Sequence, residues 1–232
     1  MGGGVPNTWI PDALSPEDSL DRLIEGNRRF REAGGGSWVR GWSEQLANVA
    51  QRPFAIVLGC SDSRTPVEIL FDQGFGDLFV VRIAGNIVAP SVVGSIEFAA
   101  SQFGSRLVVV MGHTRCGAIS ATVKALEVGK PESKNLLAIT DRITPHIQGL
   151  VRPGSTEAGS VDAMLREAMR VNVRASVDHL RHGSRILEDL VMAGRLCVVG
   201  AEYELETGTV NFLDDARTVV SSRPPSRPPA KG

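Results

Sequence analysis

The sequence predicts an α/β fold with a mainly parallel central sheet, of about four parallel strands plus an antiparallel edge strand, flanked by helices. Two observations favour this class. Short apolar runs have the length of strands and little polar alternation, which is typical of strands buried on both faces. Segments with helical periodicity separate the runs, so the order suits parallel strands joined by helices. The four runs are Phe54–Leu58, Leu78–Ile83, Leu107–Met111 and Leu196–Val199.

The first helix is expected over residues 16–33. Ser15 is a good N-cap residue, Pro16 suits the first helical position, and Glu17 makes the first turn acidic. Three consecutive glycines at 34–36 end this pattern. The other helices are expected over residues 43–48, 91–103, 117–127, 136–147, 161–180 and 184–192.

The antiparallel edge is expected from a hairpin near the end of the chain. Tyr203–Leu205 and Thr209–Phe212 flank the turn-forming residues Glu206-Thr207-Gly208. Two short strands joined through a glycine-containing turn are typical of a hairpin.

The length indicates one domain, because 232 residues is about one and a half times the usual domain size of ~150. We expect this domain to cover residues 15–215. The stretch 1–14, which contains Gly and Pro, and the Pro-rich stretch 216–232 are predicted to be disordered tails.

The charge balance excludes several classes of protein. Lys and Arg number 25 against 26 Asp and Glu, so the chain lacks the broad basic surface of a nucleic-acid or anionic-membrane binder.

No apolar run approaches the ~20 residues of a membrane span, and the N-terminus lacks the pattern of a signal peptide. Three cysteines make no disulfide framework. We therefore expect a cytoplasmic protein that uses cysteines for metal binding or chemistry.

Two of the predicted strands end in residues that can bind a metal. Cys60 follows the first apolar run, and His113 and Cys116 follow the third. Ligands of such sheets collect at the carboxyl ends of the strands, so neighbouring strands would bring the three side chains together. Two thiolates and an imidazole form a zinc ligand set that leaves one position free, as a catalytic site requires. We expect one Zn²⁺ per chain.

Each of these elements has a simpler interpretation when taken alone. A cysteine after a strand is more often a small buried apolar residue, and a His-x-x-Cys spacing arises by chance. Their position at matching strand ends, in a chain with three cysteines and four histidines, favours the metal. Cys197 lies inside a predicted strand, where core packing is the better interpretation. Pro66 stands where a phosphatase loop built on Cys60 needs Arg, and no Cys-x-x-Cys motif is present.

Asp62 and Arg64 follow Cys60 by two and four residues. An ion pair between them would hold the carboxylate ionised, so that it can only accept hydrogen bonds. Such a carboxylate can orient a zinc-bound hydroxide toward an electrophile. The alternative is that Asp62 becomes the fourth zinc ligand and closes the site. Two thiolates neutralise the charge of Zn²⁺, so the ion lowers the pKa of a bound water less than it would with three histidine ligands. We therefore expect activity to rise with pH.

Two motifs together resemble those of the β-class carbonic anhydrases, namely Cys60-Ser61-Asp62-Ser63-Arg64 and His113-Thr114-Arg115-Cys116-Gly117. The resemblance covers roughly residues 18–213. It extends to three further stretches, Glu25–Phe30, Val80–Asn86 and Gly94–Phe98.

The resemblance implies that Cys60, His113 and Cys116 hold zinc and that Asp62 and Arg64 are catalytic. The implied reaction is the reversible hydration of CO2 to bicarbonate and a proton, in a single catalytic zinc domain. The resemblance also implies a homodimer or a dimer of dimers, with the site at the dimer interface.

Four residues are assigned to substrate binding by the same resemblance: Gln51, Phe79, Phe98 and Gly117. Gln51 would reach across the dimer interface. Phe79 and Phe98 match positions of an apolar wall for uncharged CO2, with Phe98 in place of a more usual Tyr; core packing is the alternative for both.

Val57 stands where one subgroup has a Trp that completes an off-site bicarbonate pocket, so the resemblance implies the open subgroup, with water on zinc.

Three other functions stay open from the sequence. A hydrolase acting on CS2 or COS would keep the same metal and dyad residues on the same scaffold. A zinc-binding homologue without turnover would keep the metal ligands, although it would not need Asp62 and Arg64. A cysteine-dependent hydrolase would use Cys60 with His113 and no metal.

Overall fold

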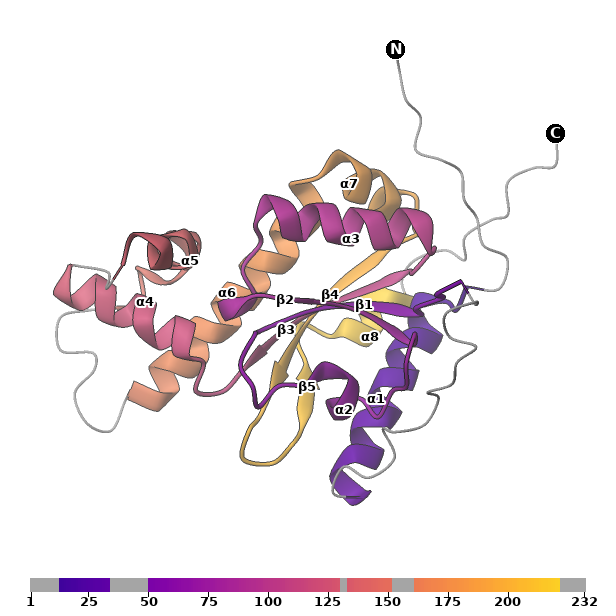
Figure 1. Ribbon diagram of the computed structural model, residues 1–232, viewed down its shortest axis with the longest axis horizontal. Helices are drawn as coiled ribbons and strands as arrows, with labels where there is room; N and C mark the ends of the chain where they lie inside the picture. The colour runs from indigo at the N-terminus through magenta and orange to yellow at the C-terminus, as the bar shows by residue number, and fades with distance from the viewer. Residues whose placement is uncertain (1–12, 34–49, 130–132, 152–160, 222–232) are drawn as a thin grey trace, which may run out of the picture.

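The computed structural model describes residues 13–33, 50–129, 133–151 and 161–221, and in these ranges one sheet lies between two layers of helices (Figure 1). The strands are β1 (Ala55–Gly59), β2 (Leu78–Arg82), β3 (Leu107–His113), β4 (Cys197–Tyr203) and β5 (Val210–Phe212). The helices are α1 (Pro16–Ala33), α2 (Val67–Leu70), α3 (Pro90–Gln102), α4 (Gly117–Val128), α5 (Lys134–Ile147), α6 (Val161–His182), α7 (Arg185–Met192) and α8 (Ala216–Ser221), with a 3-10 helix η2 (Ala84–Asn86).

The five strands are arranged in the order β2-β1-β3-β4-β5. The first four are parallel to one another, and β5 pairs with β4 in the antiparallel direction. The prediction of a mainly parallel sheet with an antiparallel edge strand is confirmed.

The predicted separate strand Tyr203–Leu205 is wrong, because β4 continues without interruption to Tyr203, which pairs with Val210 of β5. The apolar run ends at Val199, but the strand does not. Its later residue Glu202 is fully buried and forms ion pairs with Arg166 and Arg170 of α6, at 2.5 and 2.7 Å. A carboxylate can lie inside a sheet when charged partners satisfy it.

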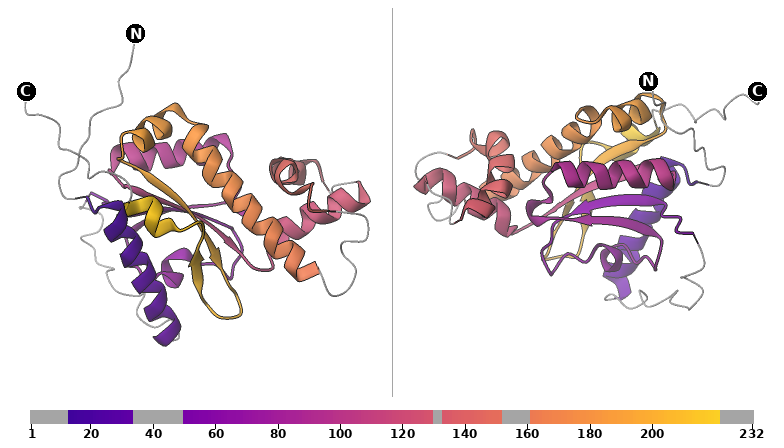
Figure 2. Two further views of the ribbon diagram at one scale, coloured as in Figure 1. Left: turned by 180° about the vertical axis from the view of Figure 1, so that it is seen from behind. Right: turned by 45° about the horizontal axis from the view of Figure 1, so that its top comes forward.

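Side chains of the sheet alternate between two apolar layers, as consecutive strand residues must. Ile56 and Leu58 of β1 belong to the layer shared with α3, α6 and α7, whereas Ala55 and Val57 belong to the layer shared with α1, α2 and α8. Figure 2 shows these two groups of helices on opposite faces of the sheet, with α4 and α5 beyond its end, beside α6. Burial on both faces explains why the strands carry little polar alternation.

The predicted helices in the described ranges correspond to α1, α3, α4, α5, α6 and α7, with every boundary within two residues. The Ser15 hydroxyl accepts a hydrogen bond from the Asp18 N–H at 3.0 Å, which makes Ser15 the cap of α1. The expected helix over 43–48 lies outside the described residues. In the parts of the chain that the structure describes, no helix could cross a membrane.

One boundary of the predicted domain needs correction. Residues 216–221, assigned to the disordered C-terminal tail, form α8 and bury Ala216 and Val220 in the layer that contains α1. The Pro-rich composition begins only after this helix. Most of both predicted tails, over 1–12 and 222–232, lies outside the described residues.

The order of the strands creates a reversal point between β1 and β3. The chain passes from β1 to β2 on one side and from β3 to β4 on the other side. The loops after β1 and β3 therefore leave in opposite directions at the carboxyl ends of these strands. In open parallel sheets this is where ligands bind.

Candidate metal centre

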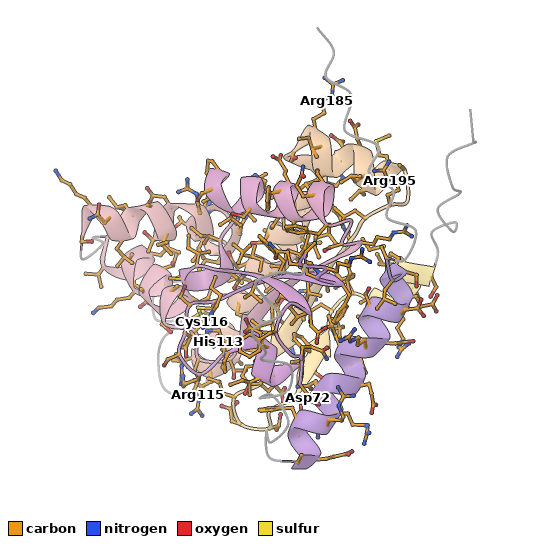
Figure 3. All side chains as sticks on the ribbon, turned by 45° about the vertical axis from the view of Figure 1, so that its right-hand side comes forward. Asp72, His113, Arg115, Cys116, Arg185 and Arg195 are labelled. Carbon is orange, nitrogen blue, oxygen red and sulfur yellow. The ribbon has the colours of Figure 1, made fainter. Side chains whose placement is uncertain are left out.

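The structure brings Cys60, His113 and Cys116 together at this reversal point. Cys60 directly follows β1, His113 is the last residue of β3, and Cys116 precedes α4. Their donor atoms all lie within 4.8 Å of one another, and all three side chains are buried. Figure 3 shows His113 and Cys116 beside each other, while the exposed side chain of Arg115 points away from them.

The spacing of the two sulfurs suits a single tetrahedral ion. Cys60 Sγ and Cys116 Sγ are 4.0 Å apart. Two thiolates bonded to one tetrahedral zinc at ~2.3 Å are separated by about 3.8 Å. The residues present therefore fit Zn²⁺ in both their chemistry and their spacing.

The imidazole of His113 is oriented as a metal ligand. Its Nδ1 lies 2.9 Å from the carbonyl oxygen of Thr114. Because a carbonyl can only accept, Nδ1 carries the proton and Nε2 keeps its lone pair. Nε2 is buried and has no hydrogen-bond partner among the described residues. A buried acceptor without a partner, beside two thiols, is the arrangement that a metal ion satisfies.

The two thiols compete for one proton. The pKa of Cys60 is lowered, chiefly because the thiol of Cys116 donates a hydrogen bond to its sulfur, with the Gly85 N–H adding to the effect. The pKa of Cys116 is raised, first because its proton is shared with Cys60 and then because it is buried. A divalent cation between the sulfurs would remove this competition, since a coordinated thiol loses its proton outright.

The position of Cys116 at the start of a helix partly offsets this rise in its pKa. Cys116 is the N-cap residue of α4, and no side chain caps the helix there. The backbone N–H groups of Ala118 and Ile119 donate to its sulfur and lower its pKa, as the N-terminus of a helix stabilises a negative charge.

Asp62 and Arg64 form a two-point ion pair beside the three donors. Arg64 Nε lies 2.9 Å from Asp62 Oδ1, and Arg64 Nη2 lies 2.7 Å from Oδ2. The Arg64 guanidinium holds the pKa of Asp62 well below its usual range. Asp62 Oδ2 is 3.9 Å from His113 Nε2, so an acceptor that stays ionised faces the metal group.

The loop that carries Cys60 and Asp62 is held by two residues for which the sequence indicated no role. Arg82, at the end of β2, donates from Nε to the Cys60 carbonyl at 3.0 Å and from Nη2 to the Asp62 carbonyl at 2.6 Å. The buried Thr65 hydroxyl donates to the same two carbonyls. Arg82 stands inside one of the stretches that carry the resemblance, which was the signal available for it.

The residues assigned to substrate binding do not all gather at this site within one chain. Gly117 adjoins Cys116 at the start of α4. Gln51 stands before β1 and Cys60 directly after it, so the length of this five-residue strand, about 17 Å, lies between them. Phe79 pairs in register with Ile56, near the amino end of β1.

Phe98 lies with Phe79 in an aromatic group on α3 and β2, their ring centroids 6.4 Å apart. Phe98 is 52% exposed, so core packing does not account for it in this chain. Phe79 is partly buried against the core, as the alternative of core packing requires.

Cys197 and Val57 lie in the other apolar layer of the sheet, which contains α1, whereas Cys60 and Cys116 belong to the layer of α3 and α6. Cys197 is fully buried in β4. Core packing, the interpretation favoured by the sequence, describes it.

Comparisons with known proteins agree on one family. The family model described as carbonic anhydrase matches residues 55–210. A carbonic anhydrase of Mycolicibacterium smegmatis is 38% identical over 200 residues, which cover 85% of this chain and 93% of the relative. Carbonic anhydrase 2 of Mycobacterium tuberculosis is 34% identical over 214 residues, covering 90% and 96%.

A solved structure extends this agreement to the fold. The β-carbonic anhydrase of Coccomyxa, in complex with acetazolamide, superposes with a TM-score of 0.62 at 26% identity, over 84% of this chain and 86% of that one. The family match spans β1 to β4, the first residue of β5 and the three donors. The chain is therefore a member of the carbonic anhydrase family, and within it of the β class.

Proposed function

We propose that this carbonic anhydrase hydrates CO2 reversibly with one Zn²⁺ per chain, held by Cys60, His113 and Cys116, and with Asp62 and Arg64 as its catalytic pair. The observation that carries the proposal is the convergence of the three donor atoms within 4.8 Å, with an ionised carboxylate beside them. Zn²⁺ bound there would lower the pKa of a coordinated water and so supply the nucleophile for CO2.

Asp62 acts as the acceptor that orients the attacking water. Because Arg64 occupies both carboxylate oxygens on one side, the lone pairs that remain are directed away from the guanidinium. The pKa of Asp62 is held low by Arg64, so Asp62 has no proton to donate near neutral pH. Its carboxylate accepts a hydrogen bond from the water and leaves a lone pair of the water oxygen free for the carbon of CO2.

Arg64 restrains the loop as well as the carboxylate. Its Nη2 also lies 3.4 Å from the carbonyl oxygen of Arg115, in the loop that joins His113 to Cys116. One guanidinium thus links the two loops that carry the metal donors. This contact supports a role for Arg64 in holding the metal donors and Asp62 at fixed positions relative to one another.

A homodimer completes the substrate site in this proposal. Gln51 and Phe79 lie toward the amino end of β1, too far to reach a substrate at Cys60 of the same chain. The exposed ring of Phe98 lies on the same edge of the sheet. A second copy that presents this edge to the metal group would supply an amide and an apolar wall for uncharged CO2.

The two thiols support a reducing compartment in this proposal. Two sulfurs 4.0 Å apart must stay reduced to bind a metal. A reducing compartment such as the cytoplasm supplies that condition.

The test is stopped-flow CO2 hydration from pH 7 to 9 on protein of known zinc content. One equivalent of zinc, with hydration that a chelator removes and Zn²⁺ restores, supports the proposal. Zinc without hydration would instead identify a zinc-binding homologue, and activity that resists the chelator would identify cysteine chemistry. The same preparation assayed on COS and CS2 separates the hydrolase alternative.

A further inference from the structure

Two buried polar side chains of α6 hold the short helix η2 through its backbone. Asn172 Nδ2 donates to the carbonyl oxygen of Gly85 at 2.9 Å, and the Ser176 hydroxyl donates to the carbonyl oxygen of Asn86 at 3.4 Å. Asn172 is 1% exposed and Ser176 5%. The two residues are one helical turn apart, so a single face of α6 anchors two consecutive carbonyls.

The same peptide segment contacts a proposed zinc ligand. The Gly85 N–H donates to Cys60 Sγ at 3.3 Å. Gly85 has φ of 68° in a left-handed conformation, which glycine adopts without cost. Because glycine also rotates most freely, the direction of this N–H depends on contacts made by its neighbours.

The surroundings leave Gly85 little space. A Cβ at this position would lie 3.0 Å from Ala118 Cβ of α4 and 3.0 Å from Ile143 Cδ1 of α5. Helices α4 and α5 thus close two sides of the peptide by packing. Two hydrogen bonds orient the peptide unit between Gly85 and Asn86, because a hydrogen bond fixes rotation where apolar packing does not. The Asn86 N–H donates to the Ile83 carbonyl at 3.0 Å within η2, and Asn172 of α6 supplies the contact from outside it.

We propose that Asn172 is a positioning residue for the metal centre: by holding the Gly85 carbonyl it aims the Gly85 N–H at the sulfur of Cys60. This inference rests on the proposed zinc site. A hydrogen bond to a coordinated thiolate withdraws electron density from the sulfur and fixes its direction. Asn172 touches neither substrate nor metal and acts through the backbone of η2.

A purely structural role for Asn172 predicts different behaviour. A buried amide that only stabilises the fold would, on removal, lower the free energy of unfolding without changing the electronic state of Cys60. The chain offers a matched control in Asn27. Its Nδ2 also donates to two backbone carbonyls, those of Leu70 and Gly208 at 3.0 Å each, on the opposite layer of the sheet.

The experiment compares wild type with Asn172→Ala, Asn172→Leu and Asn27→Ala. Asn172→Leu keeps most of the volume, and Ser176→Ala adds a milder loss on the same face. Two readouts are taken: the zinc dissociation constant from competition with a chromophoric chelator, and the energy of the thiolate-to-cobalt charge-transfer band of the Co²⁺-substituted protein. Neither readout depends on CO2 turnover.

We expect both Asn172 variants to bind zinc about 10- to 100-fold more weakly and to shift the band to lower energy, because the sulfur regains electron density. Ser176→Ala shifts it less, and Asn27→Ala leaves both readouts unchanged. Asn172 variants with wild-type affinity and band energy, or an equal shift in Asn27→Ala, would overturn the inference. Wild-type protein that binds neither metal would instead overturn the proposed function.

Discussion

The carboxylate of Asp62 and the guanidinium of Arg64 meet through two hydrogen bonds, 2.9 and 2.7 Å long, although only one residue separates them in sequence. The backbone N–H of Arg64 adds a third bond to Asp62 Oδ1 at 2.9 Å. A side chain held at three points has one orientation, and this orientation faces the metal group. The first two predictions concern this pair.

Replacing Asp62 with Asn should lower kcat for CO2 hydration by about 10- to 100-fold while zinc stays bound. The amide keeps the size of the side chain but loses the ionised acceptor. Stopped-flow rates and zinc content check this outcome. The control is Asp72→Asn, because Asp72 also pairs with an arginine, Arg29 at 2.5 Å. Loss of zinc from Asp62→Asn would show that Asp62 is a ligand and support the closed alternative.

Replacing Arg64 with Gln should lower kcat but leave the midpoint of the rise in activity with pH unchanged. Arg64 keeps the pKa of Asp62 below its usual range, so its removal lets that pKa rise toward ~3.9. Asp62 then remains ionised throughout pH 7 to 9. A profile of kcat against pH checks this result. A midpoint that moves by a full unit would mean that Asp62 itself titrates in that range.

Replacing Cys60 with Ser should remove the bound zinc and the activity, whereas Cys197→Ser should keep both. The two cysteines are buried alike but lie in different layers of the sheet. Zinc content by elemental analysis, measured beside the hydration rate, separates them. Equal zinc in the two variants would contradict the assigned ligand set.

A hybrid dimer of one Cys60→Ser chain and one Gln51→Ala chain should be active, although neither variant is active as a dimer of its own. If Gln51 acts across the dimer interface, the hybrid contains one intact site of two and about half the wild-type rate. Chains with different affinity tags allow the hybrid to be purified. The matched control joins Cys60→Ser to Asp62→Asn, in which both sites stay defective. A hybrid with Gln51→Ala that is no more active than this control would place Gln51 outside the site.

Replacing either of two helical glycines with alanine should change the free energy of unfolding, but in opposite directions. A Cβ at Gly26 of α1 would lie 1.8 Å from the carbonyl oxygen of Phe71, whereas one at Gly94 of α3 would meet nothing within 4 Å. Gly94→Ala should stabilise the fold by about 0.5–1 kcal/mol through helix propensity. Gly26→Ala should destabilise it by about 1–3 kcal/mol, because the backbones must separate. Urea unfolding measures both, and stabilisation of Gly26→Ala would refute the close approach.

The sequence predicted the buried strands well because burial on both faces leaves a plain apolar run. It failed at the end of β4, because the apolar run stops at Val199 while the strand continues past the charged Glu202. The arginines that neutralise Glu202, Arg166 and Arg170, lie 36 and 32 residues earlier in α6. A local pattern cannot indicate a partner at that distance. The same holds for α8, whose burial depends on its position against α1.

The convergence of Cys60, His113 and Cys116 was predictable for a topological reason. Parallel strands end at one edge, so Cys60 and His113 could be placed together before their distance was known. Arg82 and Asn172 could not be found in this way, because each contacts backbone atoms around the site. Arg82 stands in a stretch of the family resemblance and Asn172 in none, but only the folded chain shows which carbonyls they reach.

The separation of the proposed zinc donors along the chain would give the ion a part in folding. Cys60 and Cys116 are 56 residues apart, and their sulfurs meet only after β1 has paired with β3. An unfolded chain offers no such trio, so the binding free energy of zinc adds to the stability of the native state alone. The unfolding temperature of this enzyme should therefore increase with the free zinc concentration. A lack of zinc in the cell would lower the amount of folded enzyme as well as its activity.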